Sequence, residues 1–426
     1  MKLLRIGLCL LFAFSVFSFG AVEVWSQSAM EIGAVVLFAF WAVLVYRNPD
    51  EKIQWNSLCW PLLGVIGIGV LQLVFRATAY PFLTRAELLK FIAYFIVFFL
   101  TGQAFRQRLD LEKLAWFVVL FCFSVSLLAI IQHFTSDSEI YWMSGLKIAG
   151  DPFGPYVNRN HFAGFVELTL PMGLALMAFR GMRRDLFPLA TLLTIVPVSA
   201  LVLSGSRGGI VGFTVEVGIL VLVARHQRAL HGGRVAAVVI VLVAALAFVV
   251  WIGTGTAIER FSQVKAPQVT GARRISMARG ALHIFFDHPI IGCGLGTLVS
   301  VYPRYETAYD GKVVDHVHND YVEMLAEAGL LGGFCGAMFV WLIYRESRKN
   351  LLADQGHFSR GLHAGAAVAV CGILVHSFVD FNLHIPGNAL LFLLQVCLAA
   401  SPPLASGAPA SSLRYRVPEQ SLAPGR

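Results

Sequence analysis

Long apolar blocks, each of about twenty residues, recur along most of the chain and are separated by short polar segments. A block of this length spans a bilayer when it folds as an α-helix. The pattern therefore predicts an all-α, polytopic membrane protein with about twelve transmembrane helices. The expected spans are residues 3–20, 30–46, 57–75, 87–105, 111–131, 160–180, 186–204, 208–225, 235–252, 321–344, 361–378 and 386–400.

Composition agrees with this pattern, because 57% of the residues are hydrophobic and only 14% are charged. A soluble domain has about 25% charged residues, which argues against a string of soluble domains. The basic start at Lys2 and Arg5 resembles a signal peptide, and we interpret it as part of an uncleaved first span. We expect one integral membrane domain over residues 1–400 and a disordered cytoplasmic tail over 401–426. The seven cysteines form no CxxC pair and indicate no disulfide framework.

The basic residues predict the orientation of the spans. With the N-terminus in the cytoplasm, 20 of the 33 Lys and Arg residues fall in cytoplasmic loops or termini, as the positive-inside rule requires. This distribution explains most of the net charge of +8 without a nucleic-acid partner. The other 13 fall outside, against the rule, and several adjoin a span, which makes them functional candidates. Most of the distinctive polar sequence, including the long periplasmic loop 253–320, falls on the same side.

A polar stretch, residues 315–320, directly precedes the apolar block that begins at Tyr321. Asp320 is expected to be the N-cap of that helix, with Glu323 in the capping-box position. Histidine titrates near neutral pH, so His316 or His318 suits a general base. A capped helix end with histidines among lipid headgroups is the structural alternative. Another alternative is a metal site, unsupported by any metal-specific spacing, with ligands drawn from His316, His318, Asp320, His376, Asp380 and His384.

Two basic segments are expected on the same face. The turn 204–209 joins two spans, and its glycines allow a tight turn that presents Arg207 to a phosphate or carboxylate. Residues 271–289 predict an amphipathic helix on the outer leaflet, with arginines where an anion would meet free backbone N–H groups. A snorkelling arginine and a solvated basic face are the alternatives. The arginines of this helix are Arg273, Arg274 and Arg279, and its apolar stripe is Ile275, Ala278, Leu282, Phe285 and Phe286.

Three more segments complete the polar face. Residues 292–296 repeat glycine in a pattern that is only a weak dinucleotide signal without a preceding strand, and we interpret them as a flexible turn. The sixth span opens with polar side chains, and another polar segment, 376–384, joins the last two spans. Both are candidates for binding sugar hydroxyls, or else they are well-capped helix ends. Their candidate residues are Arg159, Asn160, His161, His376 and Asp380.

Taken together, these motifs resemble those of the O-antigen ligases and the related O-antigen and exopolysaccharide polymerases of bacterial membranes. The resemblance covers about residues 158–344, with the motifs in the same order and spacing. The matching segments are residues 204–209, 274–279, 287–289, 292–296 and 316–332.

The resemblance implies a GT-C-like, metal-independent and inverting glycosyltransferase of the bacterial inner membrane, without a cofactor and with its site facing the periplasm. The donor would be a glycan on undecaprenyl diphosphate, and the acceptor a lipid A–core sugar or another glycan. On this basis His318 is the expected catalytic base, and Arg207 and Arg274 are expected to hold the diphosphate. Fixed guanidinium groups stabilise a leaving diphosphate without a metal. The expected substrate-binding residues are Arg273, Arg279, His316, Asn319, Arg159, Asn160, His161, His376 and Asp380.

Three functions remain open from the sequence. A ligase would join a finished polysaccharide to lipid A–core, and a polymerase would join repeat units, with the same donor and motifs. A transporter would be expected to place ionisable groups near the bilayer midplane and broken helices in paired halves. The chain has no clear internal repeat, and its polar groups crowd one face. It also lacks a nucleotide-binding signature and a DxD pair, which favours a lipid-linked donor.

Overall fold

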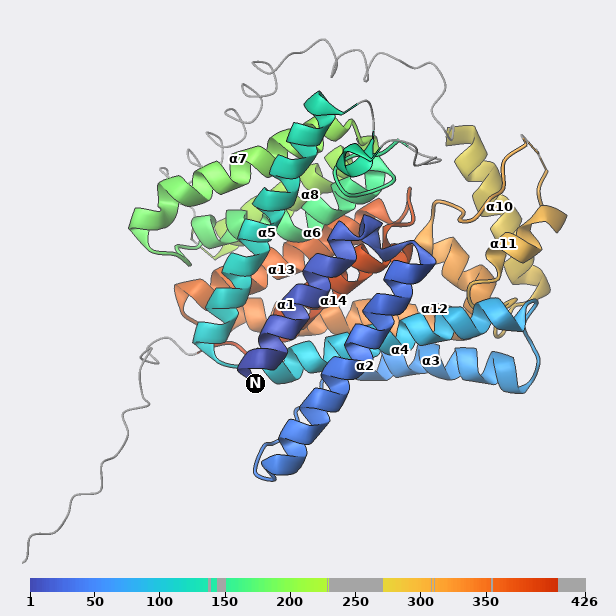
Figure 1. Cartoon of the computed structure of the whole chain (residues 1–426), viewed down its shortest axis with the longest axis horizontal. Coiled ribbons are helices and arrows are strands. Elements are labelled where there is room, and N and C mark those ends of the chain that lie inside the picture. Colours follow the sequence, from blue (N-terminus) through green and yellow to red (C-terminus); the bar gives the residue numbers. More distant parts are fainter. Residues whose placement is uncertain are drawn as a thin grey trace, which may run out of the picture.

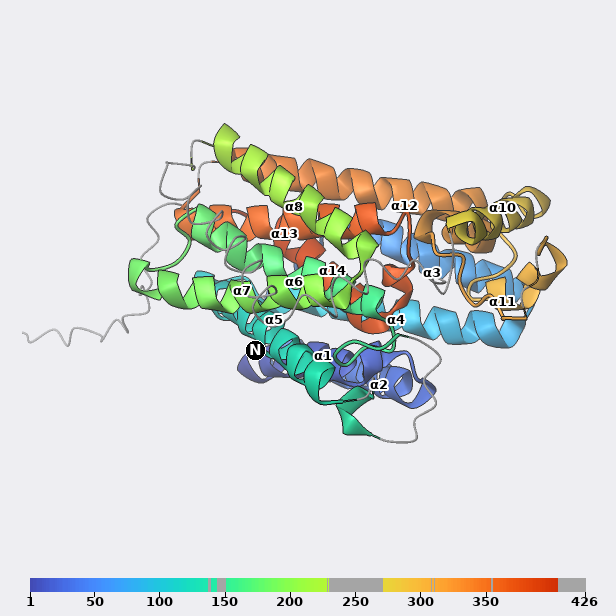
Figure 2. The same ribbon diagram turned by 90° about the horizontal axis from the view of Figure 1, so that it is seen from above.

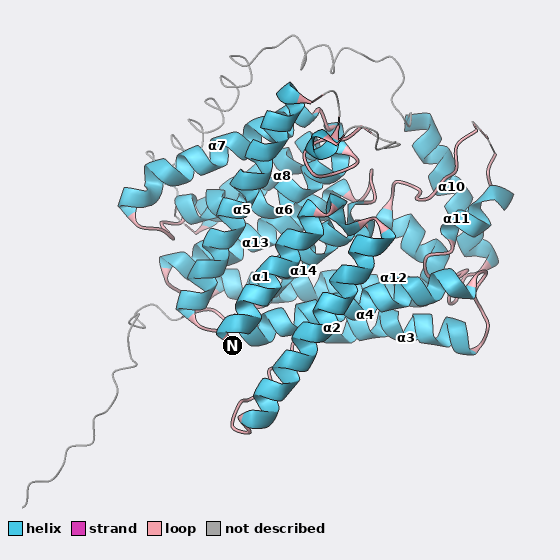
Figure 3. Cartoon of the chain, in the orientation of Figure 1, coloured by secondary structure: helices cyan, strands magenta, loops and turns pink. Residues whose placement is uncertain are grey.

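The computed structural model describes residues 1–136, 139–143, 151–227, 229, 271–307, 309, 311–353 and 355–404. Within these ranges the chain is helical and contains no β-sheet, which confirms the all-α prediction (Figure 3). Its α-helices are α1 (Lys2–Phe17), α2 (Val24–Arg47), α3 (Cys59–Val74), α4 (Pro81–Ala104), α5 (Arg108–Thr135), α6 (Arg159–Ala178), α7 (Phe187–Ser204), α8 (Arg207–His226), α10 (Gly271–Asp287), α11 (Leu298–Val301), α12 (Asp320–Leu352), α13 (His357–His376) and α14 (Pro386–Ala400). Its 3₁₀ segments are η1 (Phe19–Ala21), η2 (Ile140–Trp142), η3 (Arg184–Leu186), η4 (Tyr302–Arg304) and η5 (Asn382–His384).

Several of these helices have the length and composition of membrane spans. Long apolar helices suit lipid because each backbone N–H and C=O finds its partner within the helix. Each predicted span within the described residues coincides with a helix, and the predicted span 235–252 lies outside them. By length and composition the described helices provide seven candidate spans, so the predicted count of about twelve is not confirmed. The seven are α2, α5, α6, α7, α8, α12 and α13, while α3 and α14 are apolar but shorter.

Helix α6 forms the centre of the bundle, because it is buried from His161 to Ala178. It packs against α5, α7, α8, α13 and α14. Helices α3, α4 and α12 form a neighbouring group that reaches α10 at its end (Figure 1). In the perpendicular view, α6, α13 and α14 lie between α12 on one side and α1 and α2 on the other (Figure 2). His161 of α6 and His376 of α13 are therefore carried by inner helices.

Helix α12 is interrupted at Gly329, where φ is +63° and ψ is −159°. The turn 289–296 packs against this break, and the backbone N–H groups of Leu330 and Leu331 donate to the carbonyls of Pro289 and Ile290. A Cβ atom at Gly329 would lie 2.4 Å from the Ile290 carbonyl oxygen. The glycine-rich segment is thus a turn, as predicted, and it supplies hydrogen-bond partners where the helix is broken.

The predicted loop helix is present as α10, but it packs with a different face. Its buried residues are Met277, Gly280, Ala281 and Ile284, on the side opposite the predicted apolar stripe. A Cβ atom at Gly280 would lie 2.8 Å from the Tyr302 ring, so small residues allow this close approach. Ile275 and Phe286 remain exposed on the other face. Contact of that exposed face with the outer leaflet stays a prediction.

Candidate active site

The ends of five helices meet at one end of the bundle. Helices α6, α8, α12 and α14 begin there, and α13 ends there. Hydrogen bonds connect the ends of α6, α12, α13 and α14, and the first turn of α8 packs against His376 at the end of α13. Asn160 at the start of α6 and Arg274 of α10 both bond to the segment after α13. His384, just before α14, bonds to Asp320 at the start of α12. The structure therefore brings together polar segments that the sequence places more than two hundred residues apart.

Asp380 is the shared partner of several predicted site residues. Its side chain is 1% exposed. It accepts hydrogen bonds from His318 Nδ1 at 3.1 Å and from Asn160 Nδ2 at 2.6 Å. The guanidinium of Arg274 lies 3.7 Å from the same carboxylate and donates to the Val379 carbonyl at 2.6 Å. One buried carboxylate thus links His318 to Arg274.

The charge of Asp380 is stabilised by its surroundings. Burial alone would raise the pKa of this carboxyl group. The hydrogen bond from His318 and the neighbouring imidazoles of His161 and His376 outweigh burial and hold the pKa well below its usual range. An ionised Asp380 accepts the Nδ1 proton of His318, which leaves Nε2 as the nitrogen with a free lone pair.

Three imidazoles surround the ring of Phe381. The rings of His161 and His318 meet it edge-on with centroids 4.8 Å away, and the ring of His316 stacks on it at 4.5 Å. Phe381 is itself buried, so it fixes the spacing between the histidines. Both ring nitrogens of His161 are buried without a partner among the described residues. This site therefore has unused polar atoms as well as a rigid apolar centre.

Asn319, and not Asp320, caps helix α12. Its side-chain oxygen accepts the backbone N–H groups of Tyr321 and Val322, while its amide donates to the Phe378 carbonyl at 3.0 Å. The prediction of Asp320 as the N-cap is wrong by one residue. Asn and Asp both suit an N-cap, and here Asp320 instead accepts a hydrogen bond from His384 at 2.7 Å. Both polar groups of Asn319 are engaged by the protein, although substrate contact was predicted for this residue.

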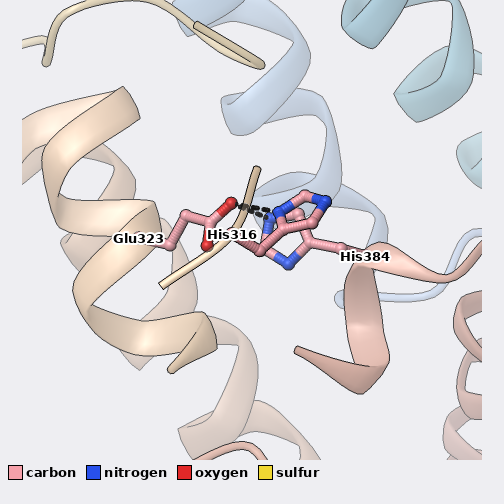
Figure 4. Close-up of side chains that lie close together, drawn as sticks. All are labelled: His316, Glu323 and His384. Carbon is pink, nitrogen blue, oxygen red and sulfur yellow. Dashed lines mark hydrogen bonds and ion pairs between the residues drawn. The ribbon is translucent and has the colours of Figure 1, made fainter. Parts of the chain in front are cut away.

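Glu323 also departs from the predicted capping box. Its Oε1 atom accepts from His316 Nδ1 at 2.6 Å (Figure 4). Its Oε2 atom accepts from the Val317 N–H at 3.0 Å. His384 Nε2 lies 3.3 Å from the same Oε1 atom. The carboxylate therefore holds the segment before the helix through backbone and side chain, and does not bond to the N-cap N–H.

His316, Glu323 and His384 form a group of side chains of the kinds that bind metal ions. Their ligand atoms lie within 4.8 Å of one another. Zinc bonds of about 2.0–2.2 Å in a tetrahedron keep ligand atoms more than ~3 Å apart. The 2.6 Å separation of His316 Nδ1 and Glu323 Oε1 is instead that of a charge-assisted hydrogen bond. The observed distances fit shared protons better than a metal ion.

The arginines predicted to be catalytic or to bind substrate occupy different positions. Arg207 begins α8 and is exposed, without an ion-pair partner among the described residues. Arg274 lies beside Asp380, and its Nε atom is buried without a described partner. Arg159 is paired with Asp151 at 2.9 Å. On α10, Arg273 is half-buried and Arg279 is exposed.

His376 lies deeper than predicted for a sugar ligand. Its side chain is 1% exposed, and Nδ1 donates to Glu167 of α6 at 2.9 Å. A Cβ atom at Gly208, next to Arg207, would lie 2.4 Å from His376 Nε2. The glycine after Arg207 thus lets the first turn of α8 approach this ring closely. This packing connects the arginine turn to the segment that carries Asp380.

Five residues of this arrangement were not predicted as site residues by the sequence: Glu167, Asp320, Glu323, Phe381 and His384. Asp320 and Glu323 were expected to cap a helix, and Asp320 and His384 were named for the metal alternative. All five lie in or next to a predicted polar segment of the outer face. That location was their only sequence signal, because their contacts join α6, α12 and the segment before α14.

Comparison with known proteins agrees with the resemblance of the motifs. Residues 190–337 match the family model described as O-antigen ligase, a region that contains Arg207, Arg274 and His318. A relative, the teichuronic acid biosynthesis protein TuaE of Bacillus subtilis, is 22% identical over 364 residues. That match covers 80% of this chain and 66% of the relative. The expected resemblance to the O-antigen ligase and polymerase family is therefore confirmed.

Proposed function

We propose that the chain is a membrane glycosyltransferase of polysaccharide assembly that moves a glycan from a lipid diphosphate to an acceptor sugar. The single observation that carries this proposal is the carboxylate of Asp380, which orients His318 and lies beside Arg274. A base and a cation for the leaving group are then held side by side. The match to the O-antigen ligase family supports the substrate class.

The reaction is a single displacement with inversion at the anomeric carbon. His318 Nε2 takes the proton of an acceptor hydroxyl, and that oxygen attacks the anomeric carbon of the donor glycan. The bond from this carbon to the diphosphate oxygen breaks, and undecaprenyl diphosphate leaves. Arg274 and Arg207 stabilise the negative charge on the leaving group, which makes a metal unnecessary.

We favour a ligase with a lipid A–core acceptor, working on the periplasmic face of the inner membrane. A polymerase that joins repeat units is the second candidate. The printed name of the Bacillus subtilis relative supports it, because that protein takes part in teichuronic acid biosynthesis. An acceptor series of lipid A–core and single repeat units, tested with one donor, distinguishes the two. A product only with lipid A–core identifies a ligase, and a ladder of repeats identifies a polymerase.

The base assignment is tested with purified protein, undecaprenyl-diphosphate glycan and acceptor. His318→Ala should lower transfer by roughly 10²–10⁴-fold while donor binding persists, because the arginines make that contact. His226→Gln, an exposed histidine at the far end of α8, is the matched control and should transfer normally. Chelator should leave the wild type active. Full transfer by His318→Ala would refute the assignment of His318 as the base. Loss of wild-type transfer in chelator, with recovery when one metal is added back, would refute metal independence.

A further inference from the structure

The carboxylate of Glu323 is placed to hold the segment that carries both candidate histidines. Its side chain is 1% exposed, and one of its oxygens accepts from the His316 ring (Figure 4). The other oxygen accepts from the Val317 N–H. His318 follows directly with φ of +52°, in the left-handed region. A backbone in this region persists only when neighbouring contacts hold it. Glu323 on one side and the Asn319 cap on the other supply those contacts.

His384 faces a carboxylate with each ring nitrogen. Nδ1 lies 2.7 Å from Asp320 Oδ1, and Nε2 lies 3.3 Å from Glu323 Oε1. The Nδ1 contact is a hydrogen bond, whereas the Nε2 contact is an ion-pair distance. Opposite charges within 4 Å of both ring nitrogens favour the protonated ring over the neutral ring. The geometry therefore favours an imidazolium between two carboxylates of the first turn of α12.

The other charged and titratable groups around His384 also favour the protonated form of its ring over the neutral form. Glu327 of α12 contributes a further carboxyl group nearby. Lys90 of α4 opposes the charge, but it is paired with Glu87 at 2.7 Å. The His316 ring lies 4.7 Å away, and its Nδ1 atom donates to Glu323. Burial lowers the pKa of His384, yet Glu323 and Asp320 raise it to about 10.

We propose that Glu323 is the positioning residue for the His316–His318 segment, and that His384 is an imidazolium at neutral pH that holds Glu323 in place. Three connected interactions then run from η5 through the first turn of α12 to the candidate base. The arrangement fixes the Nδ1 proton of His316 and leaves its Nε2 atom as the open nitrogen, on a side chain that is 28% exposed. The catalytic part of this inference rests on the proposed role of His318, whereas the charge of His384 does not.

The charge of His384 is tested by ¹⁵N NMR of histidine-labelled full-length protein in detergent. The wild type should show a doubly protonated imidazole at pH 8.5 that disappears in His384→Gln and persists in His226→Gln. Glu323→Gln should lower the pH at which this signal titrates. A spectrum in which His384→Gln removes only a neutral ring would overturn the imidazolium. Binding of one zinc per wild-type chain that is lost in His384→Gln would overturn it in favour of a metal site.

The positioning role is tested by transfer with Glu323→Gln, which keeps the shape of the side chain but removes its charge. A misplaced base can lower transfer by about 10²-fold, so we expect a loss of that order in kcat with an altered pH profile and unchanged KM for the donor. Glu323→Asp should recover part of the rate. Glu346→Gln, on the same helix at the opposite end, is the matched control and should behave as wild type.

The two proposals fail in different ways. Normal rate and pH profile for Glu323→Gln, together with an inactive His318→Ala, would overturn the positioning role and leave the base intact. An active His318→Ala would overturn the assignment of His318 as the base, and with it the positioning role of Glu323. The charge of His384 would still be decided by the NMR experiment alone.

Discussion

At the scale of single residues, the candidate site combines backbone strain with buried charge. His318 has a positive φ, which costs about 1–3 kcal/mol in a residue other than glycine. The side-chain bonds to Asp380 and the neighbouring Glu323 contacts offset this cost and fix the ring. Strain of this kind is typical of sites that must hold one side chain in one orientation.

Asp380→Asn is the residue-scale change that separates charge from shape. The amide is the same size, but it cannot stabilise the imidazolium that forms when His318 takes a proton. Transfer should fall by roughly 10²–10⁴-fold, as expected for loss of an orienting carboxylate beside a catalytic histidine. The measurement is kcat across pH, with Asp185→Asn as the control because that residue is exposed and paired with Arg183. A wild-type rate and profile for Asp380→Asn would contradict this role.

A second residue-scale prediction concerns Arg207. Its replacement by Ala should lower transfer by about 10²–10³-fold, the usual loss when one group that stabilises developing negative charge is removed. Arg207→Lys should recover only part of the rate, because an ammonium lacks the two-pronged donor geometry of guanidinium. Arg225→Ala, an exposed arginine in the last turn of the same helix, should transfer at the wild-type rate. Equal rates for Arg207→Ala and Arg225→Ala would remove the diphosphate role.

At the scale of elements, α12 is two helices joined at a glycine. The first part, from Asp320 to Ala328, carries the site, and the second part continues the candidate span. Glu327 accepts the N–H groups of Gly296 and Leu298, and Gln72 of α3 bonds to the same turn, so three elements meet at the break. The break therefore fixes the direction in which the site-bearing turn points.

Gly329→Ala tests this junction. A Cβ atom there meets a backbone carbonyl and the residue must keep a positive φ, so we expect destabilisation of about 1–3 kcal/mol or more. Gly67→Ala in α3 is the control, because nothing lies within 4 Å of the added Cβ and alanine favours a helix by about 0.5–1 kcal/mol. Thermal unfolding in detergent should show a lower midpoint only for Gly329→Ala. A midpoint equal to wild type would show that the break tolerates alanine.

The elements also explain which features could be predicted from the sequence. Apolar blocks set helix positions locally, so the predicted spans within the described residues coincide with helices. The N-cap of α12 was misplaced because a choice between Asn319 and Asp320 depends on His384, more than sixty residues away. The packed face of α10 was missed because small residues at Gly280 and Ala281, and not the largest apolar ones, allow close contact. Convergence of distant polar segments was predicted, but their pairings were not.

At the scale of the whole molecule, four histidine–carboxylate pairs are concentrated at one end of the bundle. The pairs His318–Asp380, His316–Glu323, His384–Asp320 and His376–Glu167 all lie there. Three of these pairs join segments more than sixty residues apart, so the stability of the site end should depend on the protonation of the histidines.

The pH dependence of stability follows from His384. Its pKa is about 10 in the folded chain and about 6.5 when unfolded. A raised folded pKa gives stability that is fully present below pH 6.5 and is lost as pH rises through 10. The unfolding midpoint of the wild type should therefore be higher than that of His384→Gln. This difference in midpoint should be largest at pH 6.5 and below, and it should become smaller as the pH rises toward 10. His226→Gln should follow the wild type, and a constant gap for His384→Gln would contradict the raised pKa.

The orientation of the molecule in the membrane is the last prediction, and it decides which compartment the site faces. The 20-to-13 division of basic residues predicts that the site end, with Thr307, is periplasmic and that the far end of α12, with Arg348, is cytoplasmic. Both residues are exposed, so cysteines placed there would be accessible. In intact cells an impermeant thiol reagent should label Thr307→Cys but not Arg348→Cys. The wild type gives the background labelling of the native cysteines, which are buried or half-buried. Labelling of Arg348→Cys alone would show that the site faces the cytoplasm, which would contradict a ligase that acts in the periplasm.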